Sequence, residues 1–268
     1  MATETILIAD DDRIVVQLLT SGLSSEEVKV IGAADAMQVM MSIRRSTPSV
    51  ILMDIMMPGG SGIEVLKRLR SNAQLKSVPV IAMSASNDPE LPEKVQALGA
   101  NAFLLKPVQV DDVVRTLERL LPKPGDSASK NPSVWRRCMM SSNVNPPEQA
   151  SPTPDASSAS QGETKATSTA AQVWAEYRGL ILERMTAIDT AVTALRRAKL
   201  TDEIRQKAVL EAHRLAGSLG MFGLMEGTKI AREIEQTFGD QASFGPGTPR
   251  KLNDLAAALR QILEKGIA

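Results

Sequence analysis

Four separate segments of the sequence carry side chains that together could handle a metal ion and a phosphoryl group. Aspartates occupy positions 10–12 and Asp54, and Ser84 and Lys106 follow later in the chain. Carboxylates that crowd together repel one another unless a cation lies among them, and a site made only of oxygen ligands suits a hard ion such as Mg²⁺. With a hydroxyl and a lysine nearby, such a site offers a nucleophile, a divalent ion and donors for phosphoryl oxygens. The residue types therefore indicate phosphoryl transfer.

The only histidine of the chain, His213, lies in the stretch AHRLAGSLGMFGL. The helical pattern around it has an apolar stripe made of Ala208, Ala212, Leu215, Leu219 and Phe222. At about 100° per residue, His213 lies roughly 140° from the centre of that stripe. The same face of the helix also carries Ala216, Gly217 and Gly220, so no long side chain covers the imidazole. We therefore predict an imidazole that faces water and that, when neutral, acts as a nucleophile through a ring nitrogen.

The acidic residues, the serine and the lysine each follow a short apolar run. Five such runs, TILIAD, VKVIG, SVILMD, VPVIAMS and NAFLLK, alternate with amphipathic patterns near residues 13–22, 34–46, 62–71, 88–98 and 109–121. This alternation predicts a doubly wound parallel sheet with helices on both faces, so residues 1–121 form one α/β domain. The carboxyl ends of parallel strands share one edge of a sheet. The candidate site residues should therefore converge there.

The rest of the chain divides into a linker and a helical domain. Residues 122–170 are rich in serine, proline and other small or polar residues and should form a flexible linker. Residues 171–268 carry four amphipathic patterns, near 171–198, 202–221, 224–238 and 248–265. Four helices with mostly short connections predict an all-α domain, an antiparallel four-helix bundle.

Composition narrows the classes of partner. The 31 basic and 31 acidic residues cancel, so nucleic acid is not an expected partner. No apolar run is long enough to span a membrane, and no leader marks the chain for export, so we expect a cytoplasmic protein. A single cysteine, Cys138, excludes a disulfide within the chain, and one histidine leaves no cluster of zinc ligands.

Residues 1–121 resemble the receiver domain of bacterial response regulators. The resemblance is carried by ILIADDD, by the D-x-x-x-P-x-x-x-G spacing of DIMMPGGSG, and by IAMSA and LLKP. It implies a flavodoxin-like (βα)5 fold in which Asp54 accepts the phosphoryl group. It also implies that Mg²⁺ is held by Asp11, Asp54 and the backbone carbonyl of Met56, with Asp10 acting through a bound water. Asp12 receives no role.

The same resemblance assigns residues on the later strands. It implies that Lys106 pairs with the phosphate and that the peptide bond before Pro107 is cis. Ser84 occupies the position of the switch hydroxyl, and Phe103 that of the aromatic residue that rotates inward. Phenylalanine lacks the hydroxyl of the commoner tyrosine, so the inward state would depend on packing alone. A plain aromatic residue at the sheet edge is an equally good interpretation of Phe103.

Residues 171–268 resemble a histidine phosphotransfer (HPt) domain, the four-helix relay module of phosphorelays. His213, Gly217 and Gly223 fit its H-x-x-K-G-x-x-x-x-x-G signature, and Ala216 departs from it because many members carry lysine there. The resemblance implies a phosphohistidine at His213 without the usual cation on this helix face.

Together the two resemblances imply a two-component signalling protein rather than an enzyme. The sequence has no phosphate-binding loop or kinase motif for ATP, and only slow self-dephosphorylation at Asp54 is expected. Phosphate would reach Asp54 from a sensor histidine kinase or a phosphotransfer protein, and His213 would exchange it with a receiver aspartate of this or another chain. The alternative is a phosphorylation-switched binding module whose second domain is an accessory or a phosphate sink. Self-association through the receiver is compatible with either function.

Overall fold

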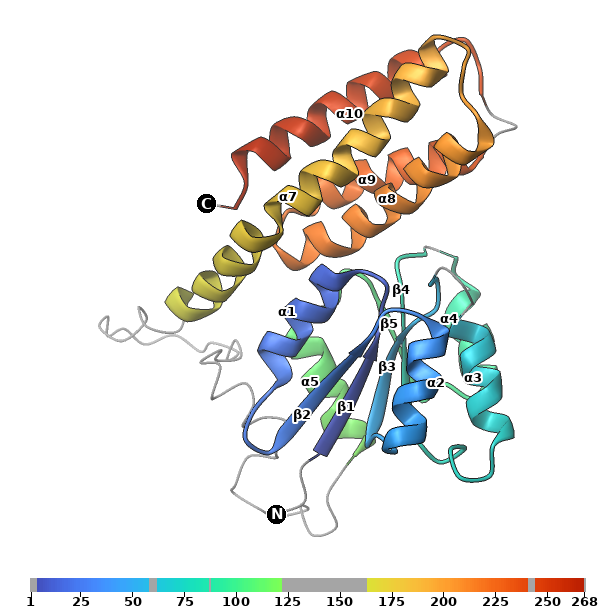
Figure 1. Ribbon diagram of the computed structural model, residues 1–268, viewed down its shortest axis with the longest axis vertical. Helices are drawn as coiled ribbons and strands as arrows, with labels where there is room; N and C mark the ends of the chain where they lie inside the picture. Colours follow the sequence, from blue (N-terminus) through green and yellow to red (C-terminus); the bar gives the residue numbers. More distant parts are fainter. Residues whose placement is uncertain (1–3, 58–61, 87, 122–162, 241–243, 268) are drawn as a thin grey trace, which may run out of the picture. The chain divides into compact units, whose positions relative to one another are not determined.

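Five parallel strands form one sheet in the order β2-β1-β3-β4-β5 (Figure 1). In this computed structural model, which describes residues 4–57, 62–86, 88–121, 163–240 and 244–267, the chain divides into two compact units, Met1–Ala171 and Gln172–Ala268. The strands of the first unit are β1 (Glu4–Ala9), β2 (Val28–Ala33), β3 (Val50–Asp54), β4 (Val80–Ser84) and β5 (Ala102–Leu105). They alternate with α1 (Arg13–Leu23), α2 (Ala36–Arg45), α3 (Gly62–Ser71), α4 (Leu91–Ala97) and α5 (Val110–Leu120). The predicted doubly wound α/β fold is confirmed.

The strand order places a crevice at the ends of β1 and β3. The chain steps from β1 outward to β2 and then returns to the other side of β1 as β3, which pairs with β1 in parallel from Ile6 opposite Val50 to Ala9 opposite Met53. Connections leave these two strands in opposite directions, and folds of this kind place their sites in the crevice at such a switch point. The aspartates of the predicted site follow or end these two strands.

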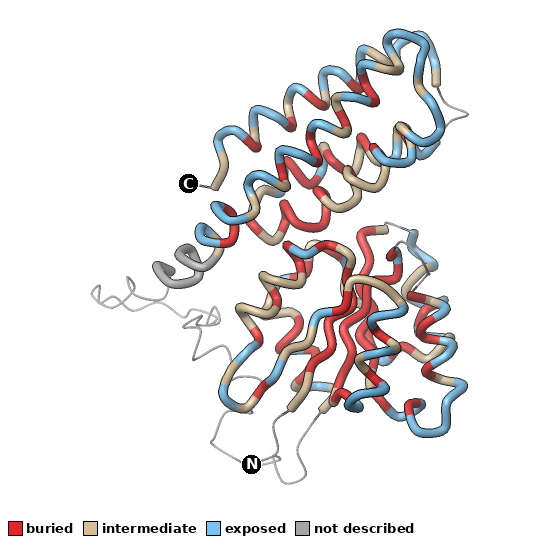
Figure 2. The backbone as a smooth tube through the Cα atoms, in the orientation of Figure 1, coloured by how far each residue is buried: buried red, intermediate tan, exposed pale blue. Residues whose placement is uncertain are grey.

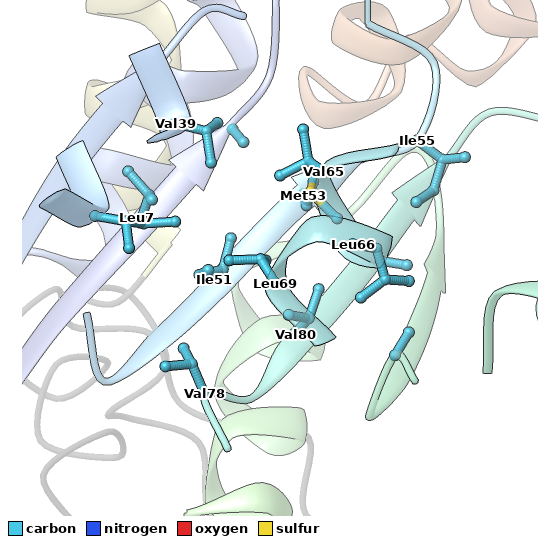
Figure 3. Packing of buried hydrophobic residues seen from close by; sticks show 14 of the residues in the cluster. Leu7, Val39, Ile51, Met53, Ile55, Val65, Leu66, Leu69, Val78 and Val80 are labelled. Atoms are coloured by element: carbon cyan, nitrogen blue, oxygen red, sulfur yellow. The ribbon is translucent and has the colours of Figure 1, made fainter. Parts of the chain in front are cut away.

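The central strands are buried on both faces, which explains their continuous apolar sequences. All residues of β3 and β4 are buried (Figure 2). One face of the sheet packs against α2, α3 and α4, and the other lies against α1 and α5 (Figure 1). Figure 3 shows the first of these layers, where Leu7, Ile51, Met53 and Val80 from the sheet meet side chains such as Leu66. This packing fixes the strand ends that carry the site.

Four helices make up the described part of the second unit. They are α7 (Glu163–Arg196), α8 (Asp202–Met221), α9 (Met225–Gly239) and α10 (Thr248–Lys265). Its core includes Ile188, Phe238 and Leu259, none of which is exposed. Among the described residues of the chain, no helix is both long enough and apolar enough to cross a membrane.

The first helix of this unit starts earlier than the sequence pattern indicated. A start at residue 171 was predicted, but α7 begins at Glu163, so residues 163–170 of the expected linker are helical. Extending an existing helix avoids the cost of nucleating a new one, and alanine and lysine in ETKATSTAA favour the helical state. The remainder of the predicted linker, residues 122–162, lies outside the described residues. The domain boundaries therefore stay a prediction.

The turn between α8 and α9 explains the second glycine of the sequence signature. Gly223 follows the last residues of α8 with a φ of 77°, in the left-handed region that side chains other than glycine rarely adopt. The backbone N–H of Leu224 donates to the carbonyl of Leu219 at 3.0 Å, which closes the helix end. This tight turn returns the chain as α9 directly alongside α8.

Candidate functional site

Three aspartates converge at the crevice between β1 and β3. Asp10, Asp11 and Asp54 each offer a carboxylate oxygen, and these oxygens all lie within 4.8 Å of one another. Asp10 and Asp54 are buried, and Asp11 is half-buried. The sequence prediction that these side chains meet at one sheet edge is confirmed.

Lys106 bridges two of these carboxylates. Its Nζ atom lies 2.6 Å from Oδ2 of Asp10 and 2.5 Å from Oδ2 of Asp54, and only 4% of the lysine side chain is exposed. Burial alone would lower the pKa of Lys106, but the negative charges of Asp10 and Asp54 outweigh burial and raise it. Burial raises the pKa of Asp10 to about 7; Lys106 opposes this shift and the Asp54 charge adds to it. The lysine is therefore a fixed cation, whereas Asp10 titrates near neutrality.

The chain around Asp54 is held by two backbone features. The Oδ1 atom of Asp54 accepts a hydrogen bond from the backbone N–H of Met56 at 2.7 Å. The start of α3 passes so close to the end of β3 that a Cβ atom on Gly62 would lie 2.2 Å from the carbonyl oxygen of Asp54. Only glycine allows this approach, which explains the last position of the D-x-x-x-P-x-x-x-G spacing. The residues between Met57 and Gly62 lie outside the described part of the chain.

The histidine of the second unit lies between α8 and α9 rather than in open water. Its Nδ1 atom is 2.9 Å from Oε1 of Glu235 on α9, and only 11% of its side chain is exposed. Ala216, Gly217 and Gly220 are also buried. The predictions that His213 faces water and that its neighbours form a bare exposed face were therefore wrong. The angular estimate used only the apolar stripe of α8, whereas α9 packs against the flank of α8 that carries His213.

Comparison with known proteins now identifies both units. The model of the response regulator receiver domain matches residues 6–118, and that of the Hpt domain matches residues 172–265. The two-component response regulator ORR3 of Oryza sativa subsp. japonica is 33% identical over 132 residues, which are 46% of this chain and all of that protein. This chain is a two-component response regulator.

Other relatives of this response regulator are longer than the matched segment. The phosphate regulon transcriptional regulatory protein PhoB of Pseudomonas aeruginosa is 30% identical over 134 residues, 49% of this chain and 58% of PhoB. The probable transcriptional regulatory protein TcrX of Mycobacterium tuberculosis is 29% identical over 123 residues, 45% of this chain and 51% of TcrX. The chain thus spans about half the length of these two relatives. Among solved structures, the chemotaxis response regulator CheY4 of Vibrio cholerae aligns with 45% of this chain and all of CheY4, at 28% identity and a TM-score of 0.42.

The residues of the response regulator's aspartate cluster fit a magnesium ion. All three side chains present oxygen atoms, which Mg²⁺ prefers, and the pKa of Asp10 is raised first by burial and then by the nearby charges of Asp54 and Asp12. A bound ion would be held by the carboxylates of Asp10, Asp11 and Asp54. The backbone carbonyl of Met56 stays a predicted fourth ligand.

The structure also locates the two predicted switch residues. Ser84 ends β4 and is buried, and its Oγ atom accepts a hydrogen bond from the backbone N–H of Ser86 at 3.1 Å. Phe103 on β5 is partly buried against the core that α2, α3 and α4 share with the sheet. The peptide bond between Lys106 and Pro107 is cis, as predicted. Rotation of Phe103 stays a prediction.

Two residues that the sequence interpretation left without a role have one in the structure. Asp12 caps α1: its Oδ1 atom accepts a hydrogen bond from the backbone N–H of Ile14 at 2.9 Å. An aspartate directly before a helical pattern is a preferred N-cap residue, so this role could have been predicted from the sequence. Glu235 holds the His213 ring, but it lies far away in the sequence, and only the pairing of α8 with α9 brings the two together.

Proposed function

We propose that this response regulator carries a phosphoryl group at two residues, on Asp54 of the receiver and on Nε2 of His213 in the Hpt domain. The observation that carries this proposal is the buried arrangement in which Lys106 bridges Asp10 and Asp54 beside Asp11. Phosphoryl transfer requires cations that stabilise the charge of the phosphoryl group. Here a fixed lysine lies beside the carboxylate, and further acidic side chains could hold a divalent ion. The proposed donors are a sensor histidine kinase or a phosphotransfer protein.

At Asp54 the transfer is a substitution at phosphorus. One carboxylate oxygen of Asp54 forms a P–O bond while the P–N bond of the donor breaks, and the departing nitrogen keeps the electron pair and takes up a proton. Lys106 lies 2.5 Å from Asp54 Oδ2, so its Nζ atom is placed to donate to a phosphoryl oxygen once the group is attached. A bound Mg²⁺ would supply further neutralisation of the phosphoryl charge.

At His213 the neighbouring carboxylate selects the reactive nitrogen. Glu235 is a hydrogen-bond acceptor, so the neutral ring places its proton on Nδ1 and leaves the lone pair on Nε2. Nε2 then forms a P–N bond while the P–O bond of an aspartyl phosphate breaks, and the aspartate carboxylate leaves with the electron pair. The phosphorylated ring keeps its Nδ1 proton and is positively charged, which Glu235 stabilises. The Nε2 atom itself is buried and only 11% of the side chain is exposed, so transfer requires neighbouring side chains to move and expose this nitrogen to the partner.

Labelling with phosphoramidate, whose P–N bond is chemically similar to that of phosphohistidine, tests both sites. The wild-type chain is incubated with phosphoramidate and Mg²⁺ and analysed by intact mass and by the stability of the label. An aspartyl phosphate is lost in alkali, whereas a phosphohistidine survives alkali and is lost in acid. We expect both kinds of bond in the wild type.

Three variants assign the bonds to residues. Asp54→Asn should remove the alkali-labile label alone, and His213→Gln the acid-labile label alone. Asp112→Asn, which removes an acid from α5 that is paired with Arg115 away from the site, should keep both. An alkali-labile label that survives Asp54→Asn contradicts the assignment of Asp54. Absence of label at His213, with Asp54 labelled, supports the binding-module alternative instead.

A further inference from the structure

A phosphoryl group on His213 would place strong negative charge in a setting that already contains a carboxylate. Glu235 lies 2.9 Å from the same ring, and Ala216, one helical turn after His213, supplies no charge. Two negative groups in a half-buried position repel each other unless a cation lies close by. If His213 carries the phosphoryl group as proposed above, another residue must supply that cation.

The pairing of α8 with α9 determines which residues lie level with each other. Two contacts fix an antiparallel register: His213 meets Glu235, and one to two turns further along α8 the Leu219 side chain reaches Gly227, where a Cβ would lie 3.1 Å from Leu219 Cδ1. Ala216 lies three residues after His213 on α8. Arg232 lies three residues before Glu235 on α9. Ala216 and Arg232 therefore lie level with each other, about one turn from the imidazole.

Arg232 also lies on the correct flank of its helix. The buried stripe of α9 runs through Gly227, Ala231, Ile234 and Phe238, and Thr228, on the flank towards Glu235 and Arg232, is buried as well. At about 100° per residue, Glu235 is displaced from the centre of this stripe by about 70° and Arg232 by about 130°, both in the same direction. The Nε atom of Arg232 is buried, so the stem of the side chain lies against the protein instead of extending into water.

Two other arginines near this turn of α8 make their contacts on the flank opposite to His213. Arg214 pairs with Glu211 at 2.9 Å, and Arg184 of α7 lies 3.6 Å from the same glutamate and 3.4 Å from Ser218. The contacts of Arg184 tie α8 to α7, whereas the Arg214 pair lies within α8. The contacts of Arg184 and Arg214 thus lie on the side of α8 away from α9, whereas Arg232 lies on α9 itself.

We propose that the guanidinium of Arg232 binds the phosphoryl group on His213 and takes the place of the cation that Ala216 lacks. Arginine suits this role because its planar group donates two parallel hydrogen bonds to phosphate oxygens and remains charged. Ala216 has a short, fully buried side chain and lies level with Arg232 on the neighbouring helix. The cation is thus supplied by α9 instead of α8, at the same level of the bundle.

Variants of the full chain test this proposal through the lifetime of the phosphohistidine. The chain is labelled with phosphoramidate, freed of donor, and the alkali-stable label is followed over time. Arg232→Ala should shorten the lifetime, or lower the initial rate of labelling, by about tenfold or more. Arg232→Lys should recover most of the loss. Lys229→Ala removes a charge from an exposed position on the same helix and should behave as the wild type.

A second variant separates charge from structure. In the Arg232→Ala background, Ala216→Lys should restore the phosphohistidine lifetime, which a merely structural role of Arg232 would not allow. Circular dichroism of every variant confirms that the helices are intact. Equal lifetimes in the wild type and Arg232→Ala, or an equal loss in Arg232→Lys, would overturn the proposal. A wild-type chain that never gains label at His213 would instead refute the proposed function.

Discussion

At the scale of single residues, the receiver site is a balance between three buried charged groups. Lys106 contacts both Asp10 and Asp54, but one ammonium group cannot neutralise two carboxylates. Burial raises the pKa of Asp10 to about 7; the charge of Lys106 lowers it, and the charges of Asp54 and Asp12 add to the rise. A proton and a divalent cation therefore compete for the same carboxylate.

This competition makes magnesium binding depend on pH. Below about pH 7 Asp10 holds a proton that must leave before the ion binds, so the dissociation constant for Mg²⁺ should rise about tenfold for each pH unit of acidification. Above that pH the dissociation constant should level off, because Asp10 is already ionised. Isothermal titration calorimetry across this range measures the slope. Asp10→Asn should bind Mg²⁺ more weakly and lose the slope near pH 7; a slope that persists in this variant contradicts the assignment.

The sequence predicted which residues come together where local position decides it. Asp54 ends β3 and Lys106 follows β5, so their convergence follows from the strand pattern. The exposure of His213 could not be obtained in the same way, because it depends on which helix packs beside α8. Glu235 was missed for the same reason: its contact with His213 is created by tertiary packing.

At the scale of elements, the approach of α3 to β3 holds Asp54, the proposed phosphoacceptor, in place. A side chain at Gly62 would collide with backbone atoms of Asp54 and Ile55, which cannot move aside as a flexible side chain would. The geometry of Asp54 therefore depends on a residue that has no chemistry of its own.

Gly62→Ala should disrupt this contact. We expect it to destabilise the receiver by about 1–3 kcal/mol, because the added methyl group forces the start of α3 away from β3. Hydrogen exchange followed by mass spectrometry should show faster exchange in β3 and α3, with α8 and α9 of the same molecule as an unchanged internal reference. Gly179→Ala is the matched control, since a Cβ there meets nothing within 4 Å in α7. Unchanged exchange in β3 would contradict the steric argument.

Element types were predictable because strands and helices in this chain have clearly different periods. The continuous apolar runs of β3 and β4 are typical of strands buried on both faces, and both were recognised. The start of α7 was not, because residues 163–170 have no apolar stripe of their own and are helical as an extension of the segment that follows.

At the scale of the whole molecule, the two proposed phosphoacceptors belong to different compact units of one chain. Asp54 lies in the unit that matches the receiver model, and His213 in the unit that matches the Hpt model. The chain therefore offers one aspartate and one histidine for the proposed relay. Joining two sites in one chain raises their effective concentration to about the mM range when the connecting segment allows them to meet.

Transfer of one phosphoryl group between two copies of the chain tests the relay most directly. A His213→Gln chain is loaded on Asp54 with phosphoramidate, freed of donor, and mixed with an unlabelled Asp54→Asn chain of different mass. The account predicts that the added mass of one phosphoryl group appears on the Asp54→Asn chain as an acid-labile, alkali-stable bond at His213. If the group instead leaves only as inorganic phosphate, at the rate seen with a partner chain that carries both substitutions, the relay between Asp54 and His213 of this protein is contradicted.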